Sequence, residues 1–337
     1  MRRVRWWWVA LALVVVLGGT AVGLWVWPYD PSLLLPDKAT PVAPLVEVPD
    51  EQATAGAEGA GIYMVDILVR RANLLEQLFP GVNDDASLIP AAALNPHGVS
   101  ERQRRQSSTL DMTRSQQIAA AVALRELGYA VEATPSGAEV ETVIPRAPAA
   151  GSLLPGDVIV EANGEAIDTP DDLRTAMEGV APGDQVEISY RRDGSVSDVT
   201  LGTRAAEDDP SRPVIGVIVQ QAASIELPID VKIDAGSVGG PSAGLAFALD
   251  IVDELGTDVD QGRRIVVTGE LALDGAVGAI GGVKQKAIGA KQAGADLFVV
   301  PEGNAEEARR YADGLEIVAV DSFGEALEAL DAEPVTS

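Results

Sequence analysis

The hydrophobic positions of the chain form one unbroken run near its start and shorter, periodic segments after it. Residues 6–27 are 22 apolar or small residues without a charge, and a helix of that length spans the hydrocarbon core of a bilayer, about 30 Å thick. Three arginines precede the run, and tryptophans stand at both of its ends. The pattern predicts a transmembrane anchor, with residues 1–5 as a cytoplasmic head and the rest extracytoplasmic. We therefore expect a single-pass protein of the cell membrane.

A cleaved signal peptide is the alternative interpretation of this run. The run exceeds the usual length of a signal-peptide core, and no clear small-x-small site ends it, so an uncleaved anchor is favoured. Residues 28–60, which follow, are rich in Pro, Ala and Gly and have no clean periodicity. Such a composition predicts a stalk between the anchor and the folded part.

The next segment, residues 61–128, mixes the two periodicities. Residues 61–69 suit a strand, and residues 70–79 suit a helix. Residues 81–110 are polar and irregular, whereas residues 114–127 predict an Ala-rich helix. We expect this strand and helix region to pack on the C-terminal domain.

Residues 129–204 predict a small β-rich domain. Thr169 and the proline after it open a single helix there, because threonine is a good N-cap and proline fits the first helical position. The stretches in which apolar and polar positions alternate, as they do in strands, are 138–144, 157–167 and 185–201.

Strands and helices alternate from residue 213 to residue 331. Apolar strand patterns occupy 214–221, 230–234, 263–271, 296–301 and 316–320. Helical patterns begin at Ser242 and near 282, 304 and 322. This rhythm predicts a compact α/β (or α+β) domain, followed by a short tail at 332–337.

Composition and charge then exclude several kinds of site. The chain has no Cys and one His, His97, so disulfides, thiolate nucleophiles and multi-histidine metal sites are excluded. Its formal charge is −26, which would repel the phosphates of a nucleic acid. We expect no nucleic-acid partner, no metal and no cofactor.

Ser242 lies within the sequence GGPSAG, between a Gly-Gly-Pro turn and an apolar run. Small residues at such a turn have two explanations. They allow another backbone to pack closely, or they hold the serine as a nucleophile at the N-terminus of a helix. A Gly-x-Ser-x-Gly esterase or a Ser-His-Asp triad needs a His after the serine, and none follows Ser242. A catalytic Ser242 would therefore need another base.

Lysine is the remaining candidate for that base, because a buried amine can lose its proton and a guanidinium cannot. Only five residues of the chain are lysines, and Lys284, Lys286 and Lys291 fall together in one predicted helix. Lys286 lies at the edge of the apolar stripe of this helix, and the other two lie on its opposite side. Lys286 is the lysine most easily buried, although helical geometry alone leaves the choice open. The stripe consists of Val283, Ala287, Ala290 and Gly294.

The β-rich segment 129–204 resembles a bacterial PDZ domain. The motifs that carry the likeness are RAPAAG (146–151), LPGDVI (154–159) and the Asn163-Gly164 turn. The resemblance implies recognition of extended peptide ends by strand addition, with backbone N–H groups receiving a terminal carboxylate. It places that carboxylate at the loop Gly128, Tyr129, Ala130 and Val131, for which an ordinary strand start is the alternative.

Residues 213–331 resemble the proteolytic domain of Lon-type peptidases. The motifs are GPSAG (240–244), TGE (268–270) and GGVKQK (281–286), in this order and at this spacing. The resemblance implies a Ser–Lys dyad in which Ser242 is the nucleophile and Lys286 the general base, with Thr268 holding the lysine. Classical Lon peptidases often have an acidic residue three positions before the serine, whereas this chain has Gly239 at that position.

With the anchor and the PDZ-like module, the whole chain resembles membrane-anchored, PDZ-containing Lon-like peptidases. We expect an ATP-independent serine endopeptidase for peptides or unfolded protein segments, because the chain has no P-loop motif. The backbone N–H groups of Ser242 and Ala243 would stabilise the oxyanion. Self-association is compatible with the sequence. The alternative is a catalytically silent, membrane-anchored PDZ scaffold that recruits protein partners.

Overall fold

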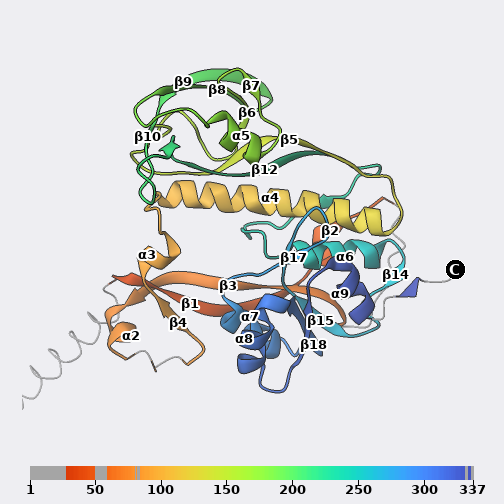
Figure 1. The fold of residues 1–337 in the computed structure, drawn as a ribbon. Helices are drawn as coiled ribbons and strands as arrows, with labels where there is room; N and C mark the ends of the chain where they lie inside the picture. Colours follow the sequence, from red (N-terminus) through yellow and green to blue (C-terminus); the bar gives the residue numbers. More distant parts are fainter. Residues whose placement is uncertain (1–27, 50–58, 80, 82–83, 331–332, 335–337) are drawn as a thin grey trace, which may run out of the picture.

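One long helix separates two sheet-containing units. The computed structural model describes residues 28–49, 59–79, 81, 84–330 and 333–334. Helix α4 (Glu101–Glu126) lies between a small β-rich unit and a larger α/β unit (Figure 1). Both units therefore contact the same helix.

The larger unit contains a six-stranded sheet with the order β19-β18-β15-β3-β1-β4. Neighbouring strands from β19 to β3 are parallel, whereas β1 is antiparallel to both β3 and β4. The strands in this order are β19 (Glu316–Val320), β18 (Leu297–Pro301), β15 (Arg264–Val267), β3 (Gly61–Asn73), β1 (Pro28–Pro41) and β4 (Ser87–Ile89).

Helices cover both faces of this sheet. In β15 the side chains of Ile265 and Val267 pack with α6 (Gly244–Glu254), whereas Val266 packs on the other face, with α7 and α8. This division follows from the period of two residues in a strand, since all three side chains are buried. Helix α7 is Val283–Gln292 and α8 is Glu302–Ala312, while α9 (Phe323–Ala329) lies on the α6 side.

The stalk predicted at 28–60 is wrong for the residues that the structure describes there. Residues 28–41 form β1, which pairs with β3 along its length, and β2 (Val46–Glu47) pairs with β13 (Lys232–Ile233). The leucines at the centre of β1 explain this, because Leu33 and Leu34 point to opposite faces and are both buried. The segment is part of the core.

Two helix boundaries between 61 and 128 also differ from the prediction. Strand β3 continues to Asn73, so the helix expected at 70–79 is reduced to α2 (Leu74–Leu78). Helix α4 begins at Glu101 rather than near 114, because the Ser100 hydroxyl accepts a hydrogen bond from the Gln103 N–H and caps it. Short elements β4 and α3 (Ala91–Leu94) occupy part of the stretch expected to be irregular.

The small unit is a β-sheet with the path β12-β5-β6-β8-β9, to which β7 adds beside β6. Helix α5 (Pro170–Ala176) covers it, and Thr169 caps this helix as predicted. Strand β12 was expected to belong to the α/β domain, but it pairs with β5 and becomes the edge of this sheet. The strands are β5 (Glu132–Val143), β6 (Val158–Ala162), β7 (Glu165–Ala166), β8 (Gln185–Arg192), β9 (Ser195–Gly202) and β12 (Val217–Glu226).

Short elements complete the two units. A 3-10 turn, η1 (Ala43–Leu45), precedes β2. Three two-residue pairs lie outside the main sheets: β10 (Arg204–Ala205) with β11 (Pro213–Val214), β14 (Thr257–Asp258) with β20 (Glu333–Pro334), and β16 (Glu270–Leu271) with β17 (Val277–Gly278).

The predicted anchor at 6–27 and the head at 1–5 lie outside the described residues, as does most of the tail. Among the residues that are described, no helix combines the length and the hydrophobicity needed to cross a membrane.

Candidate active site

The loop that carries Ser242 is held by α4. Gly240 has φ +89°, a conformation that side chains disfavour, and its N–H donates to the Ser108 carbonyl at 2.8 Å. A Cβ at Gly239 would lie 2.3 Å from the Ser108 hydroxyl oxygen. An acidic side chain at 239 would therefore require Ser108 to move.

Ser242 lies directly before α6, with Ala243 as the N-cap residue of that helix. Close packing requires glycine at the first helical position, because a Cβ on Gly244 would lie 2.7 Å from the Ser115 hydroxyl oxygen of α4. Within the described part of the chain, the N–H groups of Ser242 and Ala243 donate to no acceptor. Two free amides beside the nucleophile form the arrangement predicted for an oxyanion site.

Lys286 of α7 reaches Ser242 through the interior of the protein. The residue is 2% exposed, and its Nζ lies 2.7 Å from Ser242 Oγ and 2.9 Å from Thr268 Oγ1. A glycine allows α7 to lie this close to the sheet, since a Cβ at Gly289 would lie 2.7 Å from the carbonyl oxygen of Asp37. The lysine that the stripe argument favoured is the one that contacts the serine.

Thr268 joins the serine loop to the lysine. It follows β15, and its N–H donates to the Val299 carbonyl of β18 at 3.0 Å. Its hydroxyl donates to the Ser242 carbonyl at 3.1 Å while accepting from Lys286, and the Gly269 N–H donates to the same carbonyl at 2.9 Å. The structure thus brings Ser242, Thr268 and Lys286 together in one hydrogen-bonded group.

Burial changes the acid–base properties of this group. Loss of solvent lowers the pKa of Lys286 to about 8, and the charge of Asp66 opposes part of that shift. Asp66, on β3, has its own pKa raised by burial, while the charge of Lys286 works in the opposite direction. At pH 7 roughly a tenth of a lysine with pKa about 8 is neutral and able to accept a proton.

The other candidate side chains lie elsewhere. Lys284 donates to the carbonyl oxygens of Asp84 and Ala86 at 2.8 and 2.9 Å, and Lys291 forms an ion pair with Asp313. His97 is exposed between α3 and α4. Among the described residues, no three His, Asp or Glu side chains are arranged to hold a metal ion.

A cavity of about 1020 Å³ adjoins the serine loop. It is bounded by α4, by residues 220–223 of β12, by Pro241, which precedes Ser242, and by Glu270, which is two residues after Thr268. The cavity therefore connects the edge strand of the small unit with the neighbourhood of Ser242.

The family of the C-terminal region is decided by comparison with known proteins. Residues 217–331 match the Lon protease (S16) C-terminal proteolytic domain, and residues 125–203 match the PDZ domain. The chain carries a Lon-type proteolytic domain. The small β-rich unit is its PDZ domain, and both resemblances predicted from the sequence are confirmed.

Similar proteins include Lon protease 2 of Bacillus subtilis, 37% identical over 112 residues, which cover 33% of this chain and 19% of that protein. Lon protease of Brucella suis is 38% identical over 106 residues, covering 30% of this chain and 13% of that protein. This chain thus spans less than a fifth of the length of these relatives. The PDZ domain of the SdrC-like protein of Listeria monocytogenes is 26% identical, covering 25% of this chain and 87% of that one, with a TM-score of 0.23.

The structure contradicts two of the four residues of the carboxylate loop predicted at Gly128, Tyr129, Ala130 and Val131, and the other two stay a prediction. The N–H groups of Gly128 and Tyr129 donate to the carbonyls of Arg125 and Leu124, so they close the end of α4 and are not available to a ligand. Strand β5, which follows this loop, pairs with β12 along its length and with β6 at Ala138 and Glu139. The edge of the PDZ sheet that lies near α5 is β12.

Two parts of the site were not predicted from the sequence. Ser108 and Ser115 of α4 hold the serine loop, since the Ser108 carbonyl accepts from the Gly240 N–H and the Ser115 hydroxyl donates to the Pro241 carbonyl. Ser108 lies in the stretch expected to be irregular and Ser115 in the predicted Ala-rich helix, and nothing in the sequence distinguishes them from exposed serines. Asp66 had a weak signal, because it is the only charged residue in the otherwise apolar strand segment 61–69.

Proposed function

We propose that the Lon-type domain is a serine endopeptidase that works by a Ser–Lys dyad. The observation that carries this proposal is the 2.7 Å separation between the Ser242 hydroxyl oxygen and the Nζ of a buried lysine. Because the pKa of Lys286 is lowered to about 8, part of the amine is neutral near pH 7 and accepts the Ser242 proton.

The reaction needs only groups of this chain and water. Ser242 Oγ attacks the carbonyl carbon of the peptide bond as its proton passes to Lys286. When the carbon–nitrogen bond breaks, Lys286 returns the proton to the leaving amine and an acyl-enzyme remains. Lys286 then removes a proton from a water molecule, which attacks the acyl carbon. The bond between that carbon and Ser242 Oγ breaks, Lys286 returns the proton to Oγ, and the carboxylic acid leaves.

Two further groups support these steps. Thr268 fixes the amine by accepting one of its hydrogen bonds, so that the remaining contact is directed at Ser242. The N–H groups of Ser242 and Ala243 bind the negative oxygen of the tetrahedral intermediate. One such donor typically lowers the barrier by roughly 3–4 kcal/mol.

The substrates we propose are peptides and flexible or unfolded protein segments. A folded chain would have to be opened first, and the sequence contains no P-loop motif for ATP-driven unfolding. The free edge of β12 offers a place where an extended segment adds to the PDZ sheet. Residues of the same strand line the cavity beside the serine loop, which provides a route from recognition to cleavage.

The location we propose is the outer face of the cell membrane, with the anchor at 6–27 and a cytoplasmic N-terminus. The length of the apolar run and the arginines before it support this orientation.

A serine-reactive activity probe tests the dyad directly. The wild-type chain should be labelled, whereas Ser242→Ala and Lys286→Ala should lose at least about 99% of the labelling, since general-base catalysis contributes about 10²–10⁴-fold. Circular dichroism of each variant checks that it has folded. Equal labelling of all three chains would exclude the dyad and favour the silent PDZ scaffold.

A further inference from the structure

Large apolar side chains are exposed at one end of the larger sheet. Beyond Met64 no strand among the described residues pairs with β3 on its β15 side, and α2 follows directly after the end of β3. In this part, Leu68 and Val69 are 49% and 46% exposed, and Leu78 and Phe79 are 58% and 57% exposed. We call these four residues the apolar tip.

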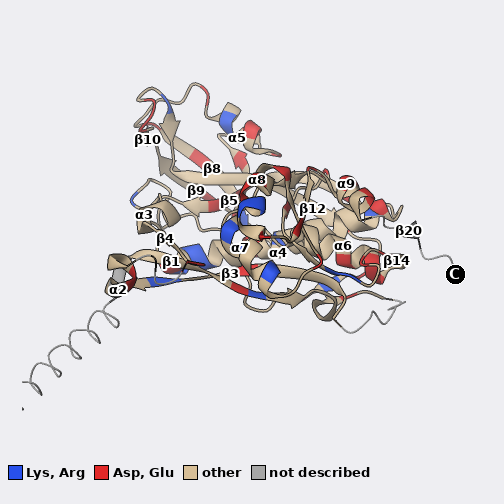
Figure 2. Ribbon diagram, turned by 90° about the horizontal axis from the view of Figure 1, so that it is seen from below, with Lys and Arg blue, Asp and Glu red and all other residues tan. Residues whose placement is uncertain are grey.

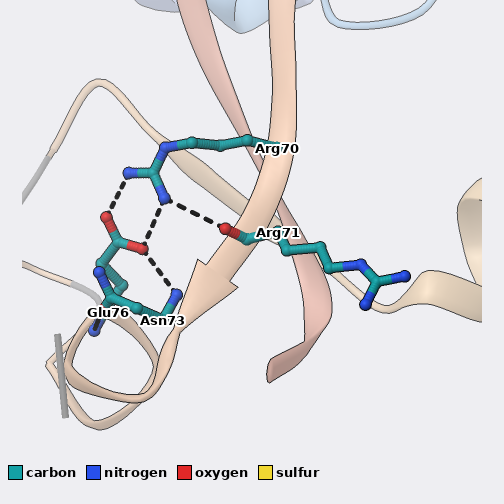
Figure 3. Close-up of polar contacts among 4 residues, drawn as sticks. All are labelled: Arg70, Arg71, Asn73 and Glu76. Carbon is teal, nitrogen blue, oxygen red and sulfur yellow. Dashed lines mark hydrogen bonds and ion pairs between the residues drawn. The ribbon is translucent and has the colours of Figure 1, made fainter. Parts of the chain in front are cut away.

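The apolar tip has a fixed shape. Arg70 of β3 forms a bidentate ion pair with Glu76 of α2 (Figure 3), which holds α2 against the end of β3. Asn73 and Glu76 also exchange two hydrogen bonds of 2.9 Å, one through each backbone N–H. The end of β3 and α2 are thus held together, and the charge of Glu76 is neutralised. Leu68 and Val69 are consecutive in β3 and point to opposite faces of the sheet, so the tip exposes apolar side chains on both faces.

The tip holds most of the large exposed apolar side chains that the structure describes. The other three are spread over distant parts of the chain, at Tyr129, Leu154 and Val196. Single exposed hydrophobic residues are ordinary, but a group at one end of a molecule marks a surface that meets an apolar environment.

The chain itself indicates what that environment is. Pro28, the first residue of β1, pairs with Asn73, the last residue of β3. Pro28 directly follows the 22-residue apolar run at 6–27, so no linker separates the predicted bilayer span from the tip. The end of β3 is therefore held next to the predicted bilayer span.

We propose that the apolar tip inserts into the outer surface of the lipid bilayer, between headgroups and acyl chains, and that the exposed Arg71 contacts lipid phosphate. This inference rests on the membrane placement proposed above. Figure 2 shows that basic residues occur in the β1–β3 region of a chain whose total charge is strongly negative. Apolar side chains beside an arginine suit the boundary between headgroups and hydrocarbon.

Such docking keeps the active site near the membrane. Asp66, which interacts with Lys286, is two residues before Leu68 on the same strand. At about 3.3 Å per residue the two positions are separated by roughly 7 Å.

The absence of cysteine makes the proposal testable in the full chain. Single variants Leu68→Cys and Phe79→Cys receive an environment-sensitive dye, and Val196→Cys, 62% exposed on β9 of the PDZ domain, is the matched control. Each chain is placed in phosphatidylcholine nanodiscs with and without bromine on the acyl chains. Bromine quenches a dye only when the two are in contact.

The expected result is at least a twofold loss of dye emission at positions 68 and 79 in brominated discs and no loss at 196. All five tryptophans lie within residues 6–27, so their intrinsic emission reports on the anchor separately. Quenched tryptophans with unquenched dyes would show an embedded anchor and overturn docking. Dyes that are blue-shifted but unquenched would indicate protein contact, such as a second copy, and would overturn it as well. Unquenched tryptophans would overturn the anchor and, with it, the docking.

Discussion

Lys286 and Ser242 are carried by different helices, and their reacting atoms nevertheless lie 2.7 Å apart. Helix α7 brings the lysine from one face of the sheet, and α6 begins on the other face directly after the serine. Thr268, which follows the central strand β15, contacts both. The Lys286 amine lies at the end of β15, beside Thr268, and is therefore both buried and close to the serine loop.

Replacing Lys286 by arginine should abolish peptide hydrolysis although the positive charge is kept. A guanidinium does not lose its proton near neutrality and so does not accept one from Ser242. We expect kcat/KM to fall at least about 100-fold, measured on a fluorogenic peptide with the variant's melting temperature as the folding control. Activity near the wild-type level would show that another group is the base.

The activity of the wild-type chain should rise with pH. The neutral form of Lys286 is the base, and its pKa is about 8, so log kcat/KM should increase by about one per pH unit below that value and level off above it. Rates with a substrate that has no titrating group between pH 5 and 9 test this. A flat profile would contradict a lysine base.

Asp66→Asn should move that profile to lower pH. The negative charge of Asp66 raises the pKa of Lys286 and so opposes the effect of burial; without it, the amine loses its proton more readily. Asp37→Asn is the matched control, because Asp37 acts on Asp66 and not directly on the lysine. A midpoint that stays in place or rises in Asp66→Asn would mean that this carboxylate does not set the pKa of the base.

The dyad was predictable because its chemistry is encoded in short motifs, whereas the surrounding framework depends on contacts between distant segments. Strand β1 was taken for a stalk because it contains prolines and buries neighbouring leucines, which removes the alternation of a half-exposed strand. Its partner β4 pairs only with Ser32–Leu34. Pro36 and Pro41, which have no N–H to donate, therefore lie where β4 requires no hydrogen bond from β1.

The sheet that β12 joins could not be predicted for a related reason. Alternation identifies β12 as a strand but does not say which sheet it joins, and in the structure it pairs with β5 across a separation of about 80 residues. The polar first half of α4 has no apolar stripe to reveal it, because it is mostly exposed.

Asp250 of α6 should lower the stability of the protein as the pH rises. It is 2% exposed, its Oδ2 has no hydrogen-bond partner among the described residues, and burial raises its pKa to about 8. In the unfolded chain this carboxyl ionises near pH 4, whereas in the folded chain it stays protonated up to about pH 8. The free energy of unfolding therefore falls with each pH unit between 4 and 8. We expect Asp250→Asn to be more stable than the wild type by an amount that grows by about 2–3 kcal/mol from pH 5 to pH 7. Urea unfolding at both pH values measures it, and a difference independent of pH would contradict the assignment.

Gly289→Ala should displace the catalytic lysine without changing any catalytic group. The added methyl would lie 2.7 Å from the Asp37 carbonyl oxygen and 3.0 Å from Val65 Cγ2, so α7 must move away from β1 and β3. Lys286 is one turn earlier on the same helix, and we expect a loss of about 1–3 kcal/mol in unfolding free energy together with at least a tenfold lower kcat. Gly303→Ala in α8 is the matched control, because its methyl would meet only Ala279 at 3.5 Å. That variant should keep full activity and gain up to about 1 kcal/mol from its higher helix propensity. Equal activity in the two variants would show that the position of the lysine tolerates a shift of α7, which a 2.7 Å proton-transfer contact should not.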